Sequence, residues 1–424
     1  MRFTYTGGIV LFLVLLVLVN AGDAGELGTL TMDNFLSSTK YDYSLENHQE
    51  LLDYLETASS STPYIDKIEI RSSSQDFLLE KQKYALRFYT KGWGETKFNN
   101  MLTESIGEAF AVEHEVYYCK ALRKRYTLIL EYLESINHLR VMHELQAVYG
   151  DRINVLKQQT GNLSFDVGEY IRAESKYTEL QLDLVKIENK LTGLIHKIHL
   201  ISDSDAKISF TDDKLIEVEE IVSTLSNLKI ISDPENIYLR DRKNKIERAR
   251  IKYDIEKSQD RDYLSYVQLE YDRDNYTKPN RAFSIDFGIK LPFIRSDQED
   301  INRRKVNYIE EKLNYEDEIR DATERNKSTL RSLNRYIDQY NILANKKASG
   351  DAQNPLDMYM KMEGINPLSL LEIRESIIRN DLQRNQIYFS ILYNYVELLD
   401  LLGSLSEEPL RNHISKARER INER

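Results

Sequence analysis

The sequence contains few of the residues that end helices or make tight turns. Of its 424 residues, 16 are glycine and 7 are proline, whereas 30% carry a charge. This balance favours long helices over the loops that connect elements in compact domains. The length would allow two or three ordinary domains, but the composition argues against compact globules.

Cysteine is nearly absent, and basic residues are not in excess. The one cysteine, Cys119, lies in a helical pattern, cannot form an intramolecular disulfide and is expected to pack against other side chains. Acidic residues outnumber basic ones by 69 to 58, which gives a net charge of −11. This charge argues against nucleic acid as a partner.

The sequence has no recognisable catalytic constellation, phosphate-binding glycine loop or nucleophile motif. His196 and His199 are three residues apart and could share a metal on a helix. No acidic or cysteine partner is evident beside them, and solvated helix histidines are far more common. We therefore expect no enzyme activity, no cofactor and no metal site.

Long apolar runs are confined to the start of the chain. Residues 1–24 combine Arg2, an apolar core over 9–19 and small residues before two candidate cleavage points, after Ala21 and after Ala24. This pattern is typical of a secretory signal peptide; an uncleaved membrane anchor is the alternative, but the run is short for a spanning helix. No later segment is apolar enough to cross a bilayer as a helix, so a mature chain that spans a membrane must use strands.

The rest of the chain repeats one order of elements: a helix, a strand segment, a very long helix, a break and a medium helix. The first repeat, residues 25–200, is predicted to contain helices over 44–55 and 64–81, a strand segment near 84–94, a long helix over 95–157 and a helix over 165–200. A connector over 201–234 leads to the second repeat, residues 235–403, with a helix over 235–262, a β-hairpin over 263–293, a long helix over 297–349 and a helix over 368–402. A polar tail follows over 404–424.

The second strand of the predicted hairpin alternates with a period of two. Its apolar side consists of Phe283, Ile285, Phe287, Ile289 and Leu291. Small or charged residues occupy the other side, namely Ala282, Ser284, Asp286, Gly288 and Lys290. Such alternation predicts a strand with one apolar and one polar face, and a soluble sandwich would explain it as well as a membrane strand.

The helix after the last break has heptad spacing. Its seam consists of Leu368, Leu371, Ile378, Leu382, Phe389, Leu392, Val396 and Leu399, with Glu375 and Asn385 at two further seam positions. The preceding long helix has a similar seam over 330–344. These seams predict antiparallel coiled-coil hairpins, and the fold class is therefore mainly α with a small β part. A structural spacer would show the same seams.

In combination, these segments resemble the TolC family of outer-membrane efflux channels. The residues that carry the resemblance are the strand over 283–293 that runs straight into a charged long helix, the helix start over 367–376, its counterpart over 161–167 and the opening segment over 30–36. The resemblance covers nearly the whole chain after the signal and is strongest over 236–403. Their order and spacing, rather than any one motif, support it.

The resemblance implies a homotrimer whose protomers share one transmembrane β-barrel and one helical tunnel. It places the protein in the outer membrane and periplasm of a Gram-negative bacterium, as the passive exit duct of a tripartite efflux system with a periplasmic adaptor and an inner-membrane pump as partners. The apolar side of the 283–291 strand would face outer-membrane lipid, and closure of the barrel would remove its exposed edges. The alternative is a periplasmic coiled-coil adaptor or scaffold that does not span the membrane.

The resemblance also suggests contact residues for the adaptor at the periplasmic tips of the two helical hairpins. These residues are Gly161, Asn162, Leu163, Ser164 and Phe165 in the first half and Gly364, Pro367, Leu368 and Ser369 in the second. The alternative is that they only pack the turns. Asp166 and Glu372 would be acids that face the pore and favour cations, although ordinary solvated acids are the simpler explanation.

The first half departs from the family pattern. Only Tyr84–Tyr89 alternates clearly, and the segment over 94–101 has few apolar residues for a lipid-facing strand. Irregular strands, a reduced barrel or a half that does not span would each account for this. Trp93, between Gly92 and Gly94, is expected to be either an interfacial anchor or a tryptophan packed in a turn.

Overall fold

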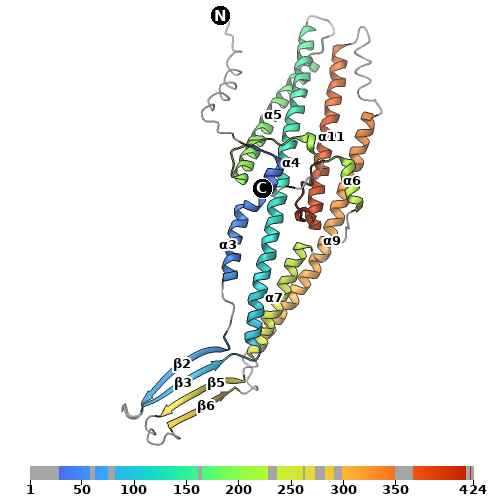
Figure 1. Ribbon diagram of the computed structural model, residues 1–424. Helices are drawn as coiled ribbons and strands as arrows, with labels where there is room; N and C mark the ends of the chain where they lie inside the picture. Colours follow the sequence, from blue (N-terminus) through green and yellow to red (C-terminus); the bar gives the residue numbers. More distant parts are fainter. Residues whose placement is uncertain are drawn as a thin grey trace, which may run out of the picture.

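The computed structural model describes residues 28–57, 63–74, 82–160, 165–227, 236–260, 263–272, 282–290, 298–348, 366–416 and 421. The molecule is elongated: long helices run side by side, and a four-stranded sheet extends from one end of them (Figure 1). The predicted signal peptide, residues 1–24, lies outside the described residues.

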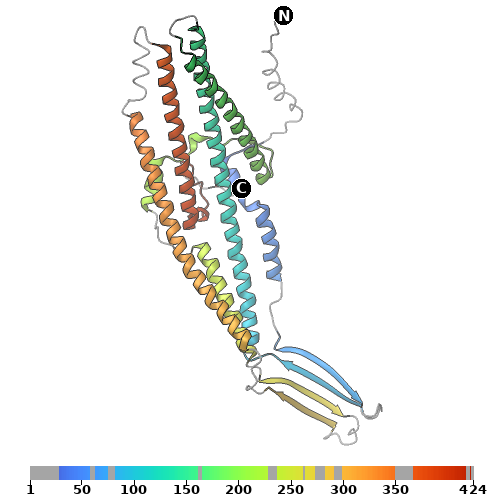
Figure 2. The same cartoon turned by 180° about the vertical axis from the view of Figure 1, so that it is seen from behind.

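The long helices form a curved wall. They are α3 (Tyr43–Thr57), α4 (Glu95–Gln158), α5 (Val167–Ser202), α7 (Ile237–Gln259), α9 (Gln298–Ala348) and α11 (Pro367–Leu402). Their contacts give the order α3–α4–α7–α9 beside the sheet and α5–α4–α11–α9 farther from it. Figure 2 shows from behind that α4 and α9 run on past the level at which α7 gives way to α11.

The length of α4 follows from its sequence. Its 64 residues include no proline, and Gly107 and Gly150 are its only glycines. It begins after Gly94, whose φ of +89° is a left-handed conformation that glycine adopts at little cost. Just before it, Gly92 lies so close to α7 that a Cβ atom would be 2.3 Å from the Ser258 carbonyl oxygen. Glycine is therefore required where the sheet passes into the wall.

The sheet takes two strands from each half of the chain. In spatial order they are β2 (Ile65–Ser74), β3 (Gln82–Thr90), β5 (Leu264–Asp272) and β6 (Phe283–Ile289), and each neighbouring pair is antiparallel. The hairpin predicted over 263–293 corresponds to β5 and β6, and the strand near 84–94 to β3. Leu291 lies outside the described residues.

The helix predicted over 64–81 is wrong, because β2 occupies residues 65–74 of it. Ile65 and Ile68 are three residues apart, a spacing that also fits one face of a helix. The alternation from Lys67 to Arg71, with β-branched Ile68 and Ile70 between charged neighbours, is the stronger signal for a strand. The first half therefore contributes two strands to the sheet rather than one.

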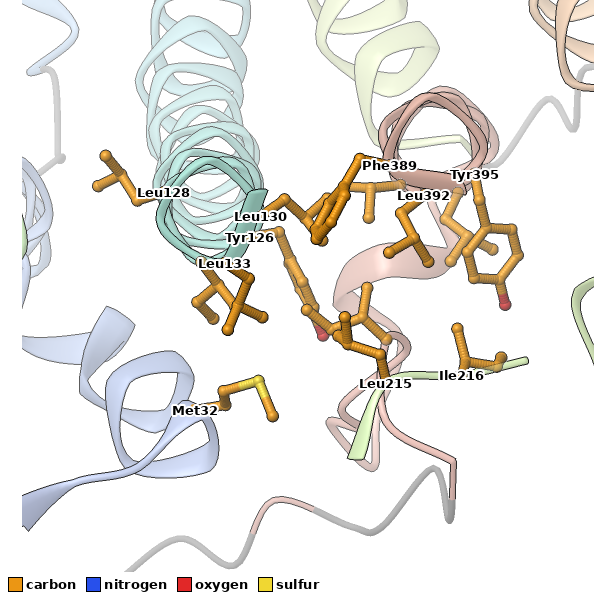
Figure 3. Close-up of a cluster of buried hydrophobic side chains, with 14 of the residues drawn as sticks. Met32, Tyr126, Leu128, Leu130, Leu133, Leu215, Ile216, Phe389, Leu392 and Tyr395 are labelled. Carbon is orange, nitrogen blue, oxygen red and sulfur yellow. The ribbon is translucent and has the colours of Figure 1, made fainter. Parts of the chain in front are cut away.

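A second layer of short elements covers one face of the wall near its middle; we call it the lateral layer. It consists of α2 (Met32–Ser37), α6 (Val218–Asn227), the parallel pair β1 (Thr29–Leu30) and β4 (Lys207–Ile208), and the chain over 404–416. In Figure 3, Tyr126 of α4 points towards Leu215, while Leu392 of α11 joins the same buried cluster. This apolar core fixes α4 and α11 to each other and to the lateral layer.

Among the described residues, no helix combines the length and the apolar character needed to cross a membrane.

Candidate functional site

One face of the sheet is apolar and exposed. The register places Ile68, Phe88, Val267 and Phe287 in one cross-strand row and Ile70, Leu86, Leu269 and Ile285 in the next. Ile70 is 82% exposed, Phe283 70% and Ile289 71%. Contiguous apolar surface of this kind is unfavourable in water and marks contact with a membrane or another protein.

The opposite face of the sheet is polar and internally hydrogen-bonded. Glu69, Arg87, Gln268 and Asp286 form one cross-strand row. The Arg87 Nε donates to Gln268 Oε1 at 2.8 Å, and Gln268 Nε2 donates to Glu270 Oε2 at 3.1 Å and to Asp286 Oδ2 at 3.4 Å. This row joins β3, β5 and β6 through side chains as well as through the backbone.

The next row of the polar face contains Lys67, Tyr89, Tyr266 and Gly288. The Tyr89 hydroxyl donates to Glu69 Oε2 at 3.0 Å, and the Arg87 guanidinium lies 3.9 Å from the centre of the Tyr266 ring. The Tyr266 ring covers Gly288, where a Cβ atom would approach the ring to 2.3 Å. The glycine that the alternation predicts on the polar side is thus needed to admit this ring.

Charges on the polar face balance within the four strands. There, four basic residues, Lys67, Arg71, Lys83 and Arg87, share it with four acidic residues, Glu69, Glu270, Asp272 and Asp286, and Lys290 follows β6 on the same side. Lys83 lies 3.2 Å from Asp272, and Arg71 lies 2.8 Å from Glu69. The face therefore carries no strong charge of one sign.

Exposed aromatic residues gather where the sheet meets the helices. Tyr64 and Tyr263 directly precede β2 and β5 and are 81% and 55% exposed, and Trp93 is 84% exposed. The alternative of a packed tryptophan is therefore wrong for Trp93. Amphipathic aromatic rings at this level suit a boundary between lipid and water.

Both lateral edges of the molecule are unpartnered within the described residues. The sheet ends in β2 on one side and β6 on the other, and the wall ends in α3 and α5 on one side and in α9 on the other. α5 exposes Val167, Ile171, Leu182, Val185 and Leu200. α9 exposes Val306, Ile309, Leu313 and Ile342. On each helix these positions fall on one side, so each edge of the wall carries an apolar stripe.

At the end of the molecule farthest from the sheet, one group of apolar residues is buried between α4, α5 and α11. Leu368, at the start of α11, is 9% exposed and clusters with Ile153, Leu156 and Ala173, with Phe165 packed beside them. Ser369 is exposed, and Pro367 is the first residue of α11, which Asn366 caps. Leu368 is therefore buried within the protomer, and its contact with an adaptor stays a prediction.

The predicted contacts Gly161, Asn162, Leu163, Ser164 and Gly364 lie outside the described residues.

Arg152 connects three helices near this end. Its guanidinium lies 2.8 Å from Glu169 of α5, 3.1 Å from Glu372 of α11 and 3.6 Å from Glu375 of α11. Glu375 also accepts hydrogen bonds from the Tyr149 hydroxyl and from Arg379, both at 2.7 Å. We call Arg152, Tyr149, Glu169, Glu372, Glu375 and Arg379 the end network.

Glu375 is held in its ionised form by this network. Partial burial opposes ionisation, but hydrogen bonds from Tyr149 and Arg379 and the charges of Arg379 and Arg152 outweigh it, so the pKa of Glu375 is lowered. The heptad pattern alone indicates that Glu375 has a polar partner, because a carboxylate at a coiled-coil seam position needs one. The sequence does not reveal that Arg152 and Tyr149 supply it.

The two predicted pore-facing acids have specific local partners. Asp166 is the N-cap of α5: its Oδ1 accepts the Glu169 backbone N–H at 3.1 Å, and Arg172 lies 3.8 Å away. Glu372 pairs with Arg152. Both carboxylates therefore have structural tasks in one protomer, and their orientation towards a pore remains a hypothesis.

No protein-family profile matches the sequence, and no curated protein sequence matches it either. Solved structures, in contrast, match along most of the chain. VceC, an outer membrane protein of Vibrio cholerae, is 13% identical, and the match covers 88% of this chain and 96% of VceC with a TM-score of 0.61.

Two outer-membrane channels match similarly. OprN is 11% identical over 88% of this chain and 90% of its own, with a TM-score of 0.64. MtrE of Neisseria gonorrhoeae, solved in an open state, is 11% identical over 88% of each chain, with a TM-score of 0.56. The fold expected from the sequence is confirmed: mainly helical, with a small sheet.

Proposed function

Because this chain has the fold of TolC-type outer-membrane channels, we propose that it is the outer-membrane duct of an export system. Three copies would close edge to edge into one tube, with the sheets forming a barrel in the outer membrane and the helices forming a conduit in the periplasm. Transport would be passive and without catalysis, and a periplasmic adaptor and an inner-membrane pump would dock at the helical end.

The two-faced sheet is the observation that carries this proposal. Its apolar face is suited to lipid and its balanced polar face to a water-filled interior. Strands β3 and β5 have nine residues each, which is enough to span a bilayer when tilted. β2 and β6 leave open edges that closure with neighbouring copies would remove.

The wall supports closure at the same two sides. The apolar stripes of α5 and α9 lie at its opposite edges, so the edge formed by α3 and α5 in one copy would pack against the α9 edge of the next. Burial of such stripes stabilises helix packing by about 25 cal/mol per Å² removed from water. A periplasmic adaptor or scaffold that never spans the membrane is not favoured, because it would leave the apolar face of the sheet in water.

The end network suggests how the conduit closes. It holds α4, α5 and α11 together around Arg152 at the end farthest from the sheet. Its release would allow the two helical hairpins of each protomer to separate, which would open the periplasmic end.

The proposal is tested by extraction and by mass. Envelope membranes that contain the full chain are washed with high salt and then at alkaline pH, and the detergent extract is analysed by light scattering. We expect the chain to stay with the membranes in both washes and to be released by detergent with the mass of a trimer. Release by salt or high pH alone would contradict the membrane assignment.

A further inference from the structure

A large cavity lies on the face of the wall opposite the lateral layer. It has a volume of about 730 Å³ and is lined by side chains of α4, α5, α7, α9 and α11. Drug-sized ligands occupy cavities of this order, roughly 300–1,000 Å³. Because helices across the wall contribute to one hollow, this face of the wall is concave.

The residues of α4 show which way the cavity faces. Lys120, Lys124, Thr127 and Glu131 line it, with the spacing of one helix face. The core under the lateral layer contains Leu122, Tyr126, Ile129 and Leu133. Each of them follows one of the cavity residues by two positions, which is about 200° around the helix. In the proposed trimer, the lateral layer would obstruct the conduit if it lay inside, so the cavity lies inside.

The basic groups of the cavity outnumber its available acids. Arg123 pairs with Asp400 at 2.9 Å, and Arg325 pairs with Glu318 at 2.5 Å. Among the described residues, no carboxylate lies within the 4.0 Å of an ion pair from Lys120, Lys124 or Lys197, all of which are exposed. Glu131 is the one acid that remains against these three lysines.

Lys120 and Lys124 have no ion-pair partner among the described residues, although the Lys120 Nζ lies 5.5 Å from the centre of the Tyr117 ring. Like charges four residues apart on a helix repel each other and lower its stability slightly. Lys197 differs, since a cation near the carboxyl end of α5 also complements the helix dipole. The apolar part of the lining, which includes Leu128, Leu239 and Leu401, lies beside the lysines. Cations next to an apolar surface suit a ligand with both an anionic group and an apolar body.

We propose that this cavity, the basic cavity, binds small organic anions with an apolar body as they pass through the conduit, with Lys120 and Lys124 as the anion contacts. The inference rests on the proposed function, because it places the cavity inside the tube. It narrows the cargo class to anions, although the chain as a whole is acidic.

The test uses the purified full-length trimer and two probes with the same ring and opposite charge, naphthalenesulfonate and trimethylnaphthylammonium. Equilibrium dialysis against detergent-only blanks gives the affinity of each. We expect the anion to bind saturably and about tenfold more tightly than the cation, as two partly screened charge contacts would give. The double variant K120Q/K124Q should lose this preference.

The matched control is K97Q/K243Q, which removes two exposed lysines outside the cavity lining and should retain the preference. Equal binding of both probes, or equal behaviour of the two double variants, would overturn the proposal. Light scattering before dialysis separates the two hypotheses. A chain that is not trimeric contradicts the proposed duct, whereas a trimer without charge preference contradicts only the basic cavity.

Discussion

The two ends of the molecule treat apolar residues differently. The sheet exposes isoleucine and phenylalanine across one whole face and keeps its charges paired on the other. The far end packs Leu368 against Ile153 and Leu156, and its exposed apolar residues, Val167 and Ile171, lie on α5 at the edge of the wall. This difference supports the proposed function, in which lipid surrounds the sheet and water surrounds the helical end.

The largest effect is expected from a charge on the apolar face. Ile285→Lys should prevent stable insertion, since a lysine near the middle of a bilayer costs roughly 2–4 kcal/mol in each copy. Ser284→Lys, one residue away on the polar face, faces Glu270 across the strands and should be tolerated. The amount of trimer in washed membranes compares the two. An equal loss of trimer in both variants would contradict the assignment of one face to lipid and the other to water.

Loss of Arg152 from the end network should cost more stability than loss of Arg172, an exposed arginine outside it. Arg152→Gln leaves Glu169 and Glu372 without their cation, and we expect a loss of about 1.5–3 kcal/mol because charged hydrogen bonds are broken. Arg172→Gln, at a side chain that is 74% exposed, should change stability by less than about 0.5 kcal/mol. Denaturant unfolding of the trimer measures both.

The same substitution tests the closing role of the network. If the end network closes the conduit, the single-channel conductance in planar bilayers should rise for Arg152→Gln and stay unchanged for Arg172→Gln. An unchanged conductance in both would leave the network with a structural role only.

Acid should weaken the end network. Because the pKa of Glu375 is lowered, its stabilising contribution is present above the ordinary range of a glutamate, about 4.3, and is lost as the pH falls through the lower value. Thermal unfolding of the wild type should therefore depend more steeply on pH below that range than unfolding of Glu375→Gln. Identical slopes would contradict this contribution.

The smallest effect concerns Asp166. Asp166→Ala should destabilise α5 by about 1 kcal/mol through loss of the N-cap, and Asp166→Ser should restore most of it. The ion selectivity of the channel then separates two roles. A capping residue leaves the reversal potential in a salt gradient unchanged in Asp166→Ser, whereas a pore-facing acid shifts it towards anions.

Regular local patterns made much of the fold readable from the sequence. The alternation over 283–289 and the heptads over 368–399 follow from one strand face and one helix seam. The strand β2 was not predicted, because the spacing of its isoleucines also fits a helical period. The end network and the basic cavity join residues more than 200 positions apart, such as Arg152 with Glu372 and Arg123 with Asp400. Local periodicity contains no information on such pairs.

The open edges of β2 and β6 have a consequence for a newly made copy. Before its neighbours arrive, it presents unpaired backbone groups beside an apolar surface, which is the combination that favours aggregation. Its folded state would then depend on how many other copies are near, because association with them supplies part of its stability. Overproduction without enough membrane to receive the chain should therefore yield precipitate, and a carrier that shields these edges during passage across the periplasm should increase the yield of assembled trimer.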